Sequence, residues 1–363
     1  MHIIITFIIV CYLLFFLFLN RVYFALRKYY KKITYKEKET GKEIDIEEKF
    51  PYMVPKDNFS YFSIVIIGIL VFPIRLFLFR ILCLIFKIHL KILKRIYINH
   101  EKDEKQRLKL EKAAYFWLSI FFFISNIKTE KKEIKYETVY KKYLGEDYDF
   151  SQKNFSLYIS NHLSYLDLAL FARDYGTSFL VWDKLKRNPL IGQPISELGN
   201  IWVELESEKS RKNVSDIIIK RQNDFYNKKS FIKTLIFPDA RCTNGKYILN
   251  FHKGAFSSLL PIKPLILIPN EEFPCCCTDF FYSLFRIMAT FKVKIIYAEL
   301  PVIKPTNYMF EKYKNLGKEK WEIFANVVNK IYSEVGGFKQ ISIKAKDIRL
   351  YKKIVNDGFY IDK

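Results

Sequence analysis

Residues 156–167 read SLYISNHLSYLD, and this stretch decides how the rest of the chain is interpreted. Its first four residues are a short apolar run that predicts a buried β-strand. Asn161 and His162 follow the strand directly, and Asp167 comes five positions after the histidine. A histidine just past a strand end faces a cleft, and an acid at this distance can fold back to bond its second ring nitrogen.

This pair predicts general-base chemistry. Asp167 would orient the imidazole of His162 and stabilise its protonated form, as in the second half of a catalytic triad. The substrate's own hydroxyl would then be the nucleophile. A histidine and an acid at this spacing also occur together in purely structural roles, so the interpretation depends on the residues around them.

Short apolar runs alternate with helical stretches on the carboxyl side of this strand. Strands are expected at 178–182, 201–205, 234–237, 265–268 and 293–300. The segments 210–225 and 318–335 have apolar residues at helical spacing, which predicts helices. Such alternation predicts an α/β domain with a central sheet flanked by helices.

Four further motifs follow in order along the same part of the chain. They are residues 237–241 (FPDAR), which follow an apolar strand, 242–244 (CTN), 251–256 (FHKGAF) and 261–265 (PIKPL), which enter a strand. As an ordered set they carry more information than the histidine and aspartate alone.

With these motifs the sequence resembles the glycerolipid acyltransferase family, and within it the lysophosphatidylcholine acyltransferase branch. The family's first motif, Asn-His followed by four residues and Asp, stands here as Asn161, His162 and Asp167. Its Phe-Pro-Glu-Gly-Thr motif is similar to residues 237–241, and the branch's later elements are similar to 242–244, 251–256 and 261–265. Upstream, residues 72–76 (FPIRL) resemble the branch's membrane hairpin, so the resemblance spans about residues 61–337.

The resemblance implies an acyl-CoA-dependent O-acyltransferase that acylates the free hydroxyl of a lysophospholipid, with His162 as general base and Asp167 as its orienting partner. Acylation of 1-acylglycerol-3-phosphate or glycerol 3-phosphate is an alternative, and a noncatalytic lipid-binding relative is another. Acyl-CoA is then a co-substrate, and no cofactor is expected. The implied substrate-binding residues are Asn161, Arg211, Phe237, Pro238, Asp239, Arg241, Lys253, Gly254 and Pro261.

Three positions depart from the family's motifs. The arginine of the second motif is replaced by Leu205, the Glu-Gly of the third motif by Asp239 and Ala240, and its threonine by Arg241. The catalytic pair is therefore retained, while the surroundings expected to bind phosphate are altered. The six cysteines form no pair with matching histidines at the spacing of a zinc site, so no metal is expected.

The amino-terminal part predicts contact with a membrane. Residues 3–19 are almost unbroken apolar residues, about long enough to cross a bilayer as a helix. The basic residues at 21–32 place the following chain in the cytosol. Residues 61–72 and 76–90 are apolar segments separated by Pro73 and containing Arg80 and Lys87, which predicts a bent, half-inserted helical hairpin.

The predicted organisation has five parts. They are an N-terminal transmembrane anchor (1–35), a polar linker (36–60), a membrane-associated helical region (61–128), an acyltransferase catalytic domain (129–337) and a basic C-terminal tail (338–363). Half of the residues are hydrophobic and the net charge is +22, which suits a lipid bilayer, although a biased genome composition would also enrich lysine. No nucleic-acid-binding module is present. The resemblance implies the endoplasmic reticulum or another endomembrane.

Overall fold

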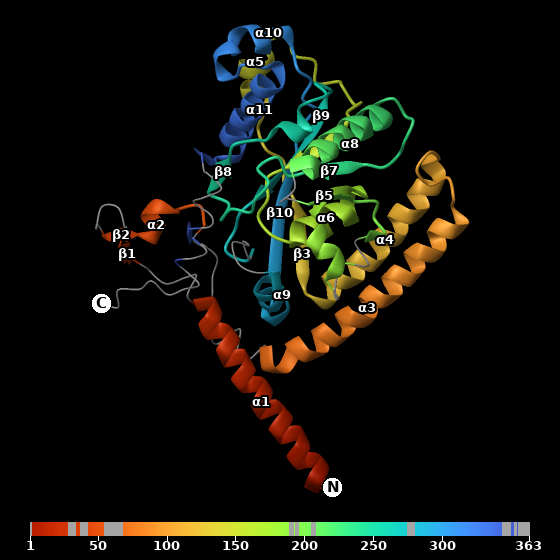
Figure 1. Cartoon of the computed structure of the whole chain (residues 1–363), viewed down its shortest axis with the longest axis vertical. Helices are drawn as coiled ribbons and strands as arrows, with labels where there is room; N and C mark the ends of the chain where they lie inside the picture. Colours follow the sequence, from red (N-terminus) through yellow and green to blue (C-terminus); the bar gives the residue numbers. More distant parts are fainter. Residues whose placement is uncertain are drawn as a thin grey trace.

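The computed structural model describes residues 2–27, 34–36, 43–53, 68–188, 192, 196–204, 208–273, 280–342, 350–351 and 354. At its centre is a seven-stranded sheet of order β3-β10-β9-β4-β7-β5-β6 (Figure 1). Neighbouring strands are parallel except β9 and β10, which are antiparallel. The strands are β3 (Ile127–Lys131), β4 (Leu157–Ser160), β5 (Ser178–Trp182), β6 (Ile201–Val203), β7 (Thr234–Ile236), β9 (Ile262–Ile268) and β10 (Val293–Glu299).

Helices cover both faces of this sheet, as the alternation along β4 requires. Leu157 and Ile159 point into a core formed with α5 (Glu137–Leu144), α8 (Glu208–Tyr226), α10 (Asn307–Lys312) and α11 (Lys320–Gly336). Tyr158 points to the opposite core, which contains α6 (Leu166–Tyr175) and α9 (Phe280–Ala289). Successive side chains of a strand face opposite sides, so β4 is buried on both. The predicted α/β fold is confirmed.

The helical hairpin consists of α3 (Gly68–Ile96) and α4 (Glu104–Ile124), which lie side by side along one edge of the molecule (Figure 1). The predicted break at Pro73 is wrong, because α3 continues through it. Pro73 is near the start of the helix, where its missing N–H removes only the bond to the carbonyl of Ile69. The turn of the hairpin lies at residues 97–103 instead.

Arg75 shows why a charge is tolerated in this apolar helix. Its guanidinium is buried and donates to the carbonyls of Met288 (2.9 Å) and Thr290 (2.6 Å), at the carboxyl end of α9. Cations are favoured at helix carboxyl ends, where carbonyl groups lack partners within the helix. The arginine therefore fastens the hairpin to the catalytic domain.

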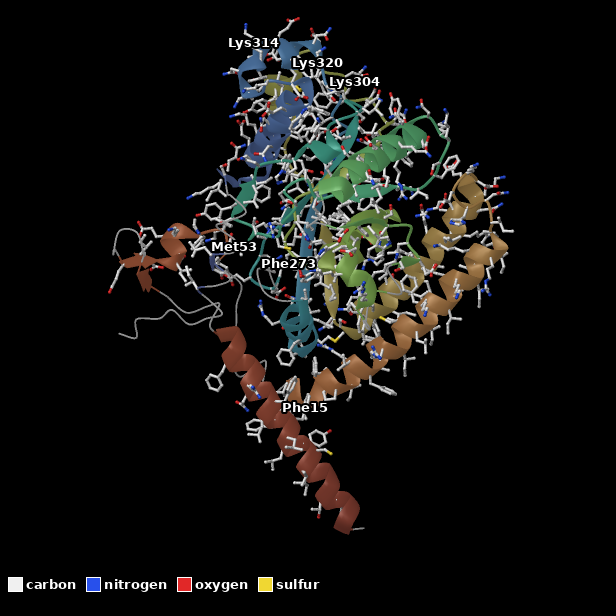
Figure 2. The ribbon with its side chains drawn as sticks, in the orientation of Figure 1. Phe15, Met53, Phe273, Lys304, Lys314 and Lys320 are labelled. Carbon is white, nitrogen blue, oxygen red and sulfur yellow. The ribbon has the colours of Figure 1, made fainter. Side chains whose placement is uncertain are left out.

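One helix in the described part of the chain, α3, is long and apolar enough to cross a membrane by length and composition. Its inner face packs on the domain, while Ile74, Phe77, Leu84 and Ile88 are exposed on its outer face. The helix α1 (His2–Arg27) extends away from the domain, and Phe15 stacks on Phe72 where it meets the start of α3 (Figure 2). That α1 spans the bilayer stays a prediction.

The segments flanking the catalytic domain are packed onto it. On the amino-terminal side, β2 (Glu43–Asp45) pairs with β1 (Thr34–Lys36), and α2 (Ile46–Lys49) follows β2. The expectation of a polar linker over 36–60 is wrong for 43–53, because apolar residues among its charges are buried. The expected C-terminal tail likewise begins with β11 (Lys339–Ile341), which pairs with β8 (Tyr247–Leu249).

Candidate active site

His162 and Asp167 meet at the carboxyl end of β4, near the middle of the sheet. Asp167 lies in the first turn of α6, and its Oδ2 is 2.8 Å from the Nδ1 of His162. The histidine side chain is 15% exposed and the aspartate side chain is fully buried. The predicted hydrogen bond is confirmed, while the catalytic role of the pair stays a prediction.

The same oxygen of Asp167 receives two backbone donors. The amides of Leu163 and Ser164 donate to Oδ2 over 2.7 and 2.9 Å. Three converging donors suit a carboxylate, as does the position of Asp167 at the start of a helix. Because Nδ1 carries the proton that bonds Asp167, Nε2 is the ring nitrogen that can accept a proton.

Phe237 supports the imidazole from the other side. Its ring lies parallel to that of His162, with the ring centroids 4.1 Å apart and the planes inclined by 16°. Phe237 follows β7 directly, and β7 is parallel to β4, so the two residues emerge side by side. The structure therefore gives this predicted substrate-binding residue a contact with the base itself.

Asn161 and Asp239 are buried beneath the His162 loop. The Asn161 amide exchanges two hydrogen bonds with the backbone of Leu267, of 3.0 and 2.8 Å. Asp239 is 2% exposed, and its Oδ2 accepts the backbone N–H of His162 over 3.2 Å. The carboxyl of Asp239 is therefore buried against the backbone of the His162 loop, and its contact with the head group stays a prediction.

Burial also changes the ionisation of Asp239. Desolvation raises the pKa of its carboxyl to about 7, with His162 acting in the opposite direction. Its Oδ1 has no hydrogen-bond partner within the described residues. This carboxyl supports the backbone of His162, and its raised pKa favours the protonated form.

The turn after Asp239 shows the effect of the altered motif. Ala240 has φ of 54°, in the left-handed region where the family's glycine carries no steric penalty. Arg241 follows on the exposed side of the turn. The pKa of His252 is lowered by burial and, to a lesser extent, by the charge of Arg241. The backbone of Pro238 accepts a hydrogen bond from the His252 amide over 2.8 Å.

Three other predicted substrate-binding residues lie away from His162. Lys253 lies 5.3 Å from the ring centroid of Trp321 on α11 and faces that helix. Gly254 packs close to Ile218 of α8. Pro261 bonds the backbone of Ser156 before β4 begins, and so lies at the amino edge of the sheet, opposite His162. The structure therefore does not bring these three residues together with His162, and their contacts with substrate stay predictions.

Two predicted positions fall outside what can be described. Leu205 lies outside the described residues, and Arg211 is on α8 with its side chain outside them. The substrate contact of Arg211 stays a prediction.

A cluster of cations and tryptophans at the ends of β5 and β6 was missed. Lys184 lies 4.9 Å from the ring centroid of Trp182, and Lys186 lies 5.5 Å from that of Trp202. Because β4, β5, β6 and β7 are parallel, their carboxyl ends share the edge that holds His162. The run 183–187 (DKLKR), directly after a predicted strand, was the signal that could have identified it.

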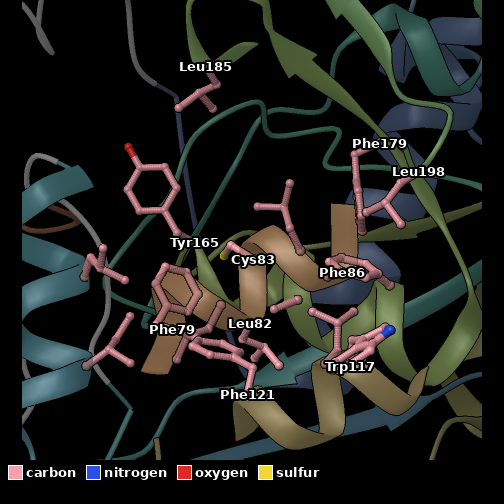
Figure 3. A pocket seen from close by; sticks show the side chains of 17 residues that line it. Phe79, Leu82, Cys83, Phe86, Trp117, Phe121, Tyr165, Phe179, Leu185 and Leu198 are labelled. Carbon is pink, nitrogen blue, oxygen red and sulfur yellow. The ribbon is translucent and has the colours of Figure 1, made fainter. Parts of the chain in front are cut away.

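An apolar cavity of about 130 Å³ begins at the loop that carries the base. Tyr165 and Leu166, between His162 and Asp167, form part of its wall (Figure 3). The remaining walls come from α3, α4, α6 and α9 and from the strand β5. They include Phe79, Leu82, Phe86, Trp117, Phe121, Ala169 and Phe179.

Known proteins with similar sequences match the part of the chain that carries this site. The acyltransferase family model matches residues 137–269, which contain both His162 and Asp167. Similar proteins include the lysophospholipid acyltransferase LPEAT1 of Arabidopsis thaliana, 29% identical over 201 residues that cover 54% of this chain and 49% of that protein. Lysophosphatidylcholine acyltransferase 2 of Homo sapiens is 29% identical over 171 residues, covering 45% and 29%.

Lysophosphatidylcholine acyltransferase 2B of Mus musculus is 35% identical over 89 residues, covering 24% of this chain and 17% of that protein. The crystal structure of the 1-acyl-sn-glycerophosphate acyltransferase PlsC of Thermotoga maritima matches with a TM-score of 0.41 and 14% identity, covering 71% of this chain and 96% of that one. This chain spans about half or less of the length of these curated relatives. Residues 137–269 of this chain thus match the acyltransferase family model, and the chain is similar to lysophospholipid and lysophosphatidylcholine acyltransferases.

Proposed function

We propose that this chain is an acyl-CoA-dependent O-acyltransferase that transfers a fatty acyl group to the free hydroxyl of a lysophospholipid. One observation carries the proposal: the His162–Asp167 pair stands at the carboxyl end of a central strand, beside an apolar cavity whose wall includes Tyr165 and Leu166 between the two members of the pair. A base next to an apolar cavity suits a substrate with a reactive head and a hydrocarbon chain.

The geometry supports a single displacement at the thioester. Nε2 of His162 would take the proton of the acceptor hydroxyl as its oxygen attacks the acyl carbonyl, and Asp167 would stabilise the imidazolium so formed. Collapse of the tetrahedral intermediate breaks the carbon–sulfur bond and leaves an ester. The imidazolium returns the proton to the departing thiolate, which leaves as the free thiol of CoA.

Donors for the developing oxyanion must come from outside the Asp167 loop. The amides of Leu163 and Ser164 already donate to Asp167, and the amide of Thr243 donates to the carbonyl of His162. Stabilisation of the oxyanion requires donors aimed at the reacting oxygen. We therefore propose that the oxyanion is stabilised by hydrogen-bond donors that come close to it only when the substrates bind.

The charges around the cleft fit anionic substrates. Lys186 and Arg241 lie at the carboxyl edge of the parallel strands, the edge that holds His162. CoA and lysophospholipids carry phosphates, which such cations bind. Phosphate groups would lie over this edge while the acyl chain enters the cavity.

The exposed apolar face of α3 supports a position at a membrane. Its outward side chains would enter the lipid, while Arg75 holds its inner face to the domain. We propose that the protein resides in the endoplasmic reticulum or another endomembrane, with the catalytic domain facing the cytosol, where acyl-CoA is available to it.

Acylation by the purified protein tests this function. Labelled acyl-CoA is offered with lysophosphatidylcholine, lysophosphatidylethanolamine, 1-acylglycerol-3-phosphate and glycerol 3-phosphate. His162→Ala should lower the rate by about 10²- to 10⁴-fold, the usual contribution of a general base. His100→Ala is the matched control, since His100 bonds only the turn of the hairpin, through the carbonyl of Tyr97 at 2.9 Å.

The outcomes separate the alternatives. A preference for glycerol 3-phosphate or 1-acylglycerol-3-phosphate would replace the proposed acceptor. Transfer to no acceptor by folded protein would favour a noncatalytic lipid-binding role. Near-normal transfer by His162→Ala would show that the base has been assigned to the wrong residue.

A further inference from the structure

The backbone of His162 is held on both sides by the turn that follows Asp239. Its N–H donates to Asp239, and its carbonyl accepts the amide of Thr243 over 3.0 Å. The position of the catalytic histidine therefore depends on where the residues after Asp239 lie.

Asn244, the next residue, connects this turn to a segment almost 200 residues earlier in the chain. Its backbone amide donates to the carbonyl of Tyr52 over 2.9 Å, and its side-chain Nδ2 donates to that of Pro51 over 2.7 Å. Its Oδ1 accepts the amide of Lys246 over 3.2 Å and shapes the turn itself. One asparagine thus joins the catalytic turn to the region before α3.

The segment that Asn244 contacts is firmly buried, although it is only a few residues long. Ile46, Phe50 and Met53 are 3%, 1% and 5% exposed, and Met53 lies beside the body of the domain (Figure 2). Burial of large apolar side chains stabilises the packed position of a segment. Such a segment can hold a turn in place, which a solvated linker could not.

Residues from the opposite end of the chain complete the same cluster. Tyr351 and Ile354 are buried against it, and the Tyr351 ring meets that of Phe50 edge-on, with the centroids 5.7 Å apart. Leu249 of β8, which leads out of the catalytic turn, belongs to it as well. Residues 46–53 and residues 351 and 354 therefore converge near the turn that holds His162.

We propose that residues 46–53, together with Tyr351 and Ile354, act as a brace that fixes the catalytic histidine, and that Asn244 is the positioning residue through which the brace acts. The inference rests on the proposed function, since it assigns His162 the role of base. Catalysis is sensitive to small displacements, and a shift of about 1 Å can cost on the order of 10²-fold.

Asn244→Asp isolates the connection. The carboxylate keeps the acceptor for Lys246, but replaces the donor to Pro51 by an oxygen that faces a carbonyl oxygen. Asn244→Ala removes both side-chain hydrogen bonds, to Pro51 and from Lys246, and keeps the backbone bond to Tyr52. The matched control is Asn250→Ala, because Asn250 also donates through Nδ2, to Ser342 over 2.9 Å, at an exposed site that does not touch the turn.

The first measurement separates kcat from KM in the full-length protein. Asn244→Asp and Asn244→Ala should lower kcat by about 10- to 100-fold while KM for acyl-CoA changes less than about twofold. Asn250→Ala should leave both unchanged. A kcat within twofold of wild type in either folded Asn244 variant, or a loss that follows only the unfolded fraction, would overturn the proposal.

The second measurement needs no activity, so it distinguishes failure of this inference from failure of the proposed function. Hydrogen exchange of the amides of His162 and Thr243 should quicken at least about tenfold in Asn244→Asp and stay unchanged in Asn250→Ala. Unchanged exchange at both amides would refute the brace even in a protein without transferase activity.

Discussion

Replacing Asp167 by asparagine tests the charge beside His162 with little change of shape. The amide oxygen can take the place of Oδ2 and accept the same three N–H groups, from His162, Leu163 and Ser164. The amide nitrogen then occupies the place of Oδ1, which has no hydrogen-bond partner among the described residues. The substitution therefore removes the negative charge and leaves the loop closed.

The expected loss follows from the distance between the charges. The charge matters when His162 is an imidazolium, with its Nδ1 at 2.8 Å from the carboxylate. Coulomb's law with an effective dielectric constant of about 20 gives about 6 kcal/mol at this distance, an upper bound. A hydrogen bond to a charged group contributes about 1.5 to 3 kcal/mol, and this range gives a lower bound. At about 1.4 kcal/mol per factor of ten, kcat should fall by about 10- to 10⁴-fold.

The assay is acyl transfer from labelled acyl-CoA at saturating acceptor, with thermal unfolding measured on the same samples. KM should change little, because the charge acts after the substrates have bound. Asp174→Asn on the same helix is the control, since Asp174 bonds the hydroxyl of Tyr297 (2.9 Å) away from the base. A folded Asp167→Asn protein with kcat within about threefold of wild type would refute the assignment of Asp167.

Three further substitutions test other features of the site. Ala240→Gly should raise the melting temperature by about 1 to 3 °C, because an L-residue with φ of 54° is strained by about 1 kcal/mol; a lower melting temperature would contradict this. The pKa of Asp239 is raised in the fold to about 7, so its contribution to stability is complete below about pH 4 and is lost as the pH rises to 7. Asp239→Asn should therefore flatten the stability profile between pH 4 and 7, and parallel urea-unfolding profiles for the two proteins would count against it. Ala169→Phe should fill part of the apolar cavity and reduce the rate with long-chain acyl-CoA more than with short-chain acyl-CoA. An equal effect at all chain lengths would show that the acyl chain does not bind in this cavity.

The central strand and its catalytic loop could be predicted because their signals are local. A four-residue apolar run followed by polar residues marks the end of β4, and the five-residue spacing of His162 and Asp167 allows the loop to close on itself. The same holds for β5, whose bounds are those expected from its apolar run at 178–182. Short-range pattern and turn geometry suffice for features of this kind.

Which end of a strand a residue occupies also follows from the sequence once the strands are known to be parallel. His162 follows β4, whereas Pro261 precedes β9, so the two must lie at opposite edges. The prediction that all motifs form one site did not take account of these opposite edges. Trp182, Trp202, Lys184 and Lys186 lie near the carboxyl ends of β5 and β6, on the edge that holds His162, and were missed for the same reason.

The brace and the apolar cavity could not be predicted, because each is built from distant segments. Phe50 and Tyr351 are 301 positions apart and meet in one cluster. The cavity depends on how α3 and α4 dock on α6, a matter of long-range packing. Apolar residues among many charges, as in residues 43–53, show no clear periodicity, so composition indicated a linker there.

The altered third motif now has a physical interpretation. Asp239 and Ala240 stand where the family has glutamate and glycine, and the shorter acid lies beneath His162, supporting its backbone. This buried carboxyl supports the backbone of His162, and its contact with a substrate head group stays a prediction. We propose that cations at the same edge of the sheet bind the head group, among them the exposed Lys186 and Arg241. Because Arg241 stands where the family has threonine, it adds an exposed positive charge to this edge, and we expect an anionic acceptor to be preferred over a neutral one.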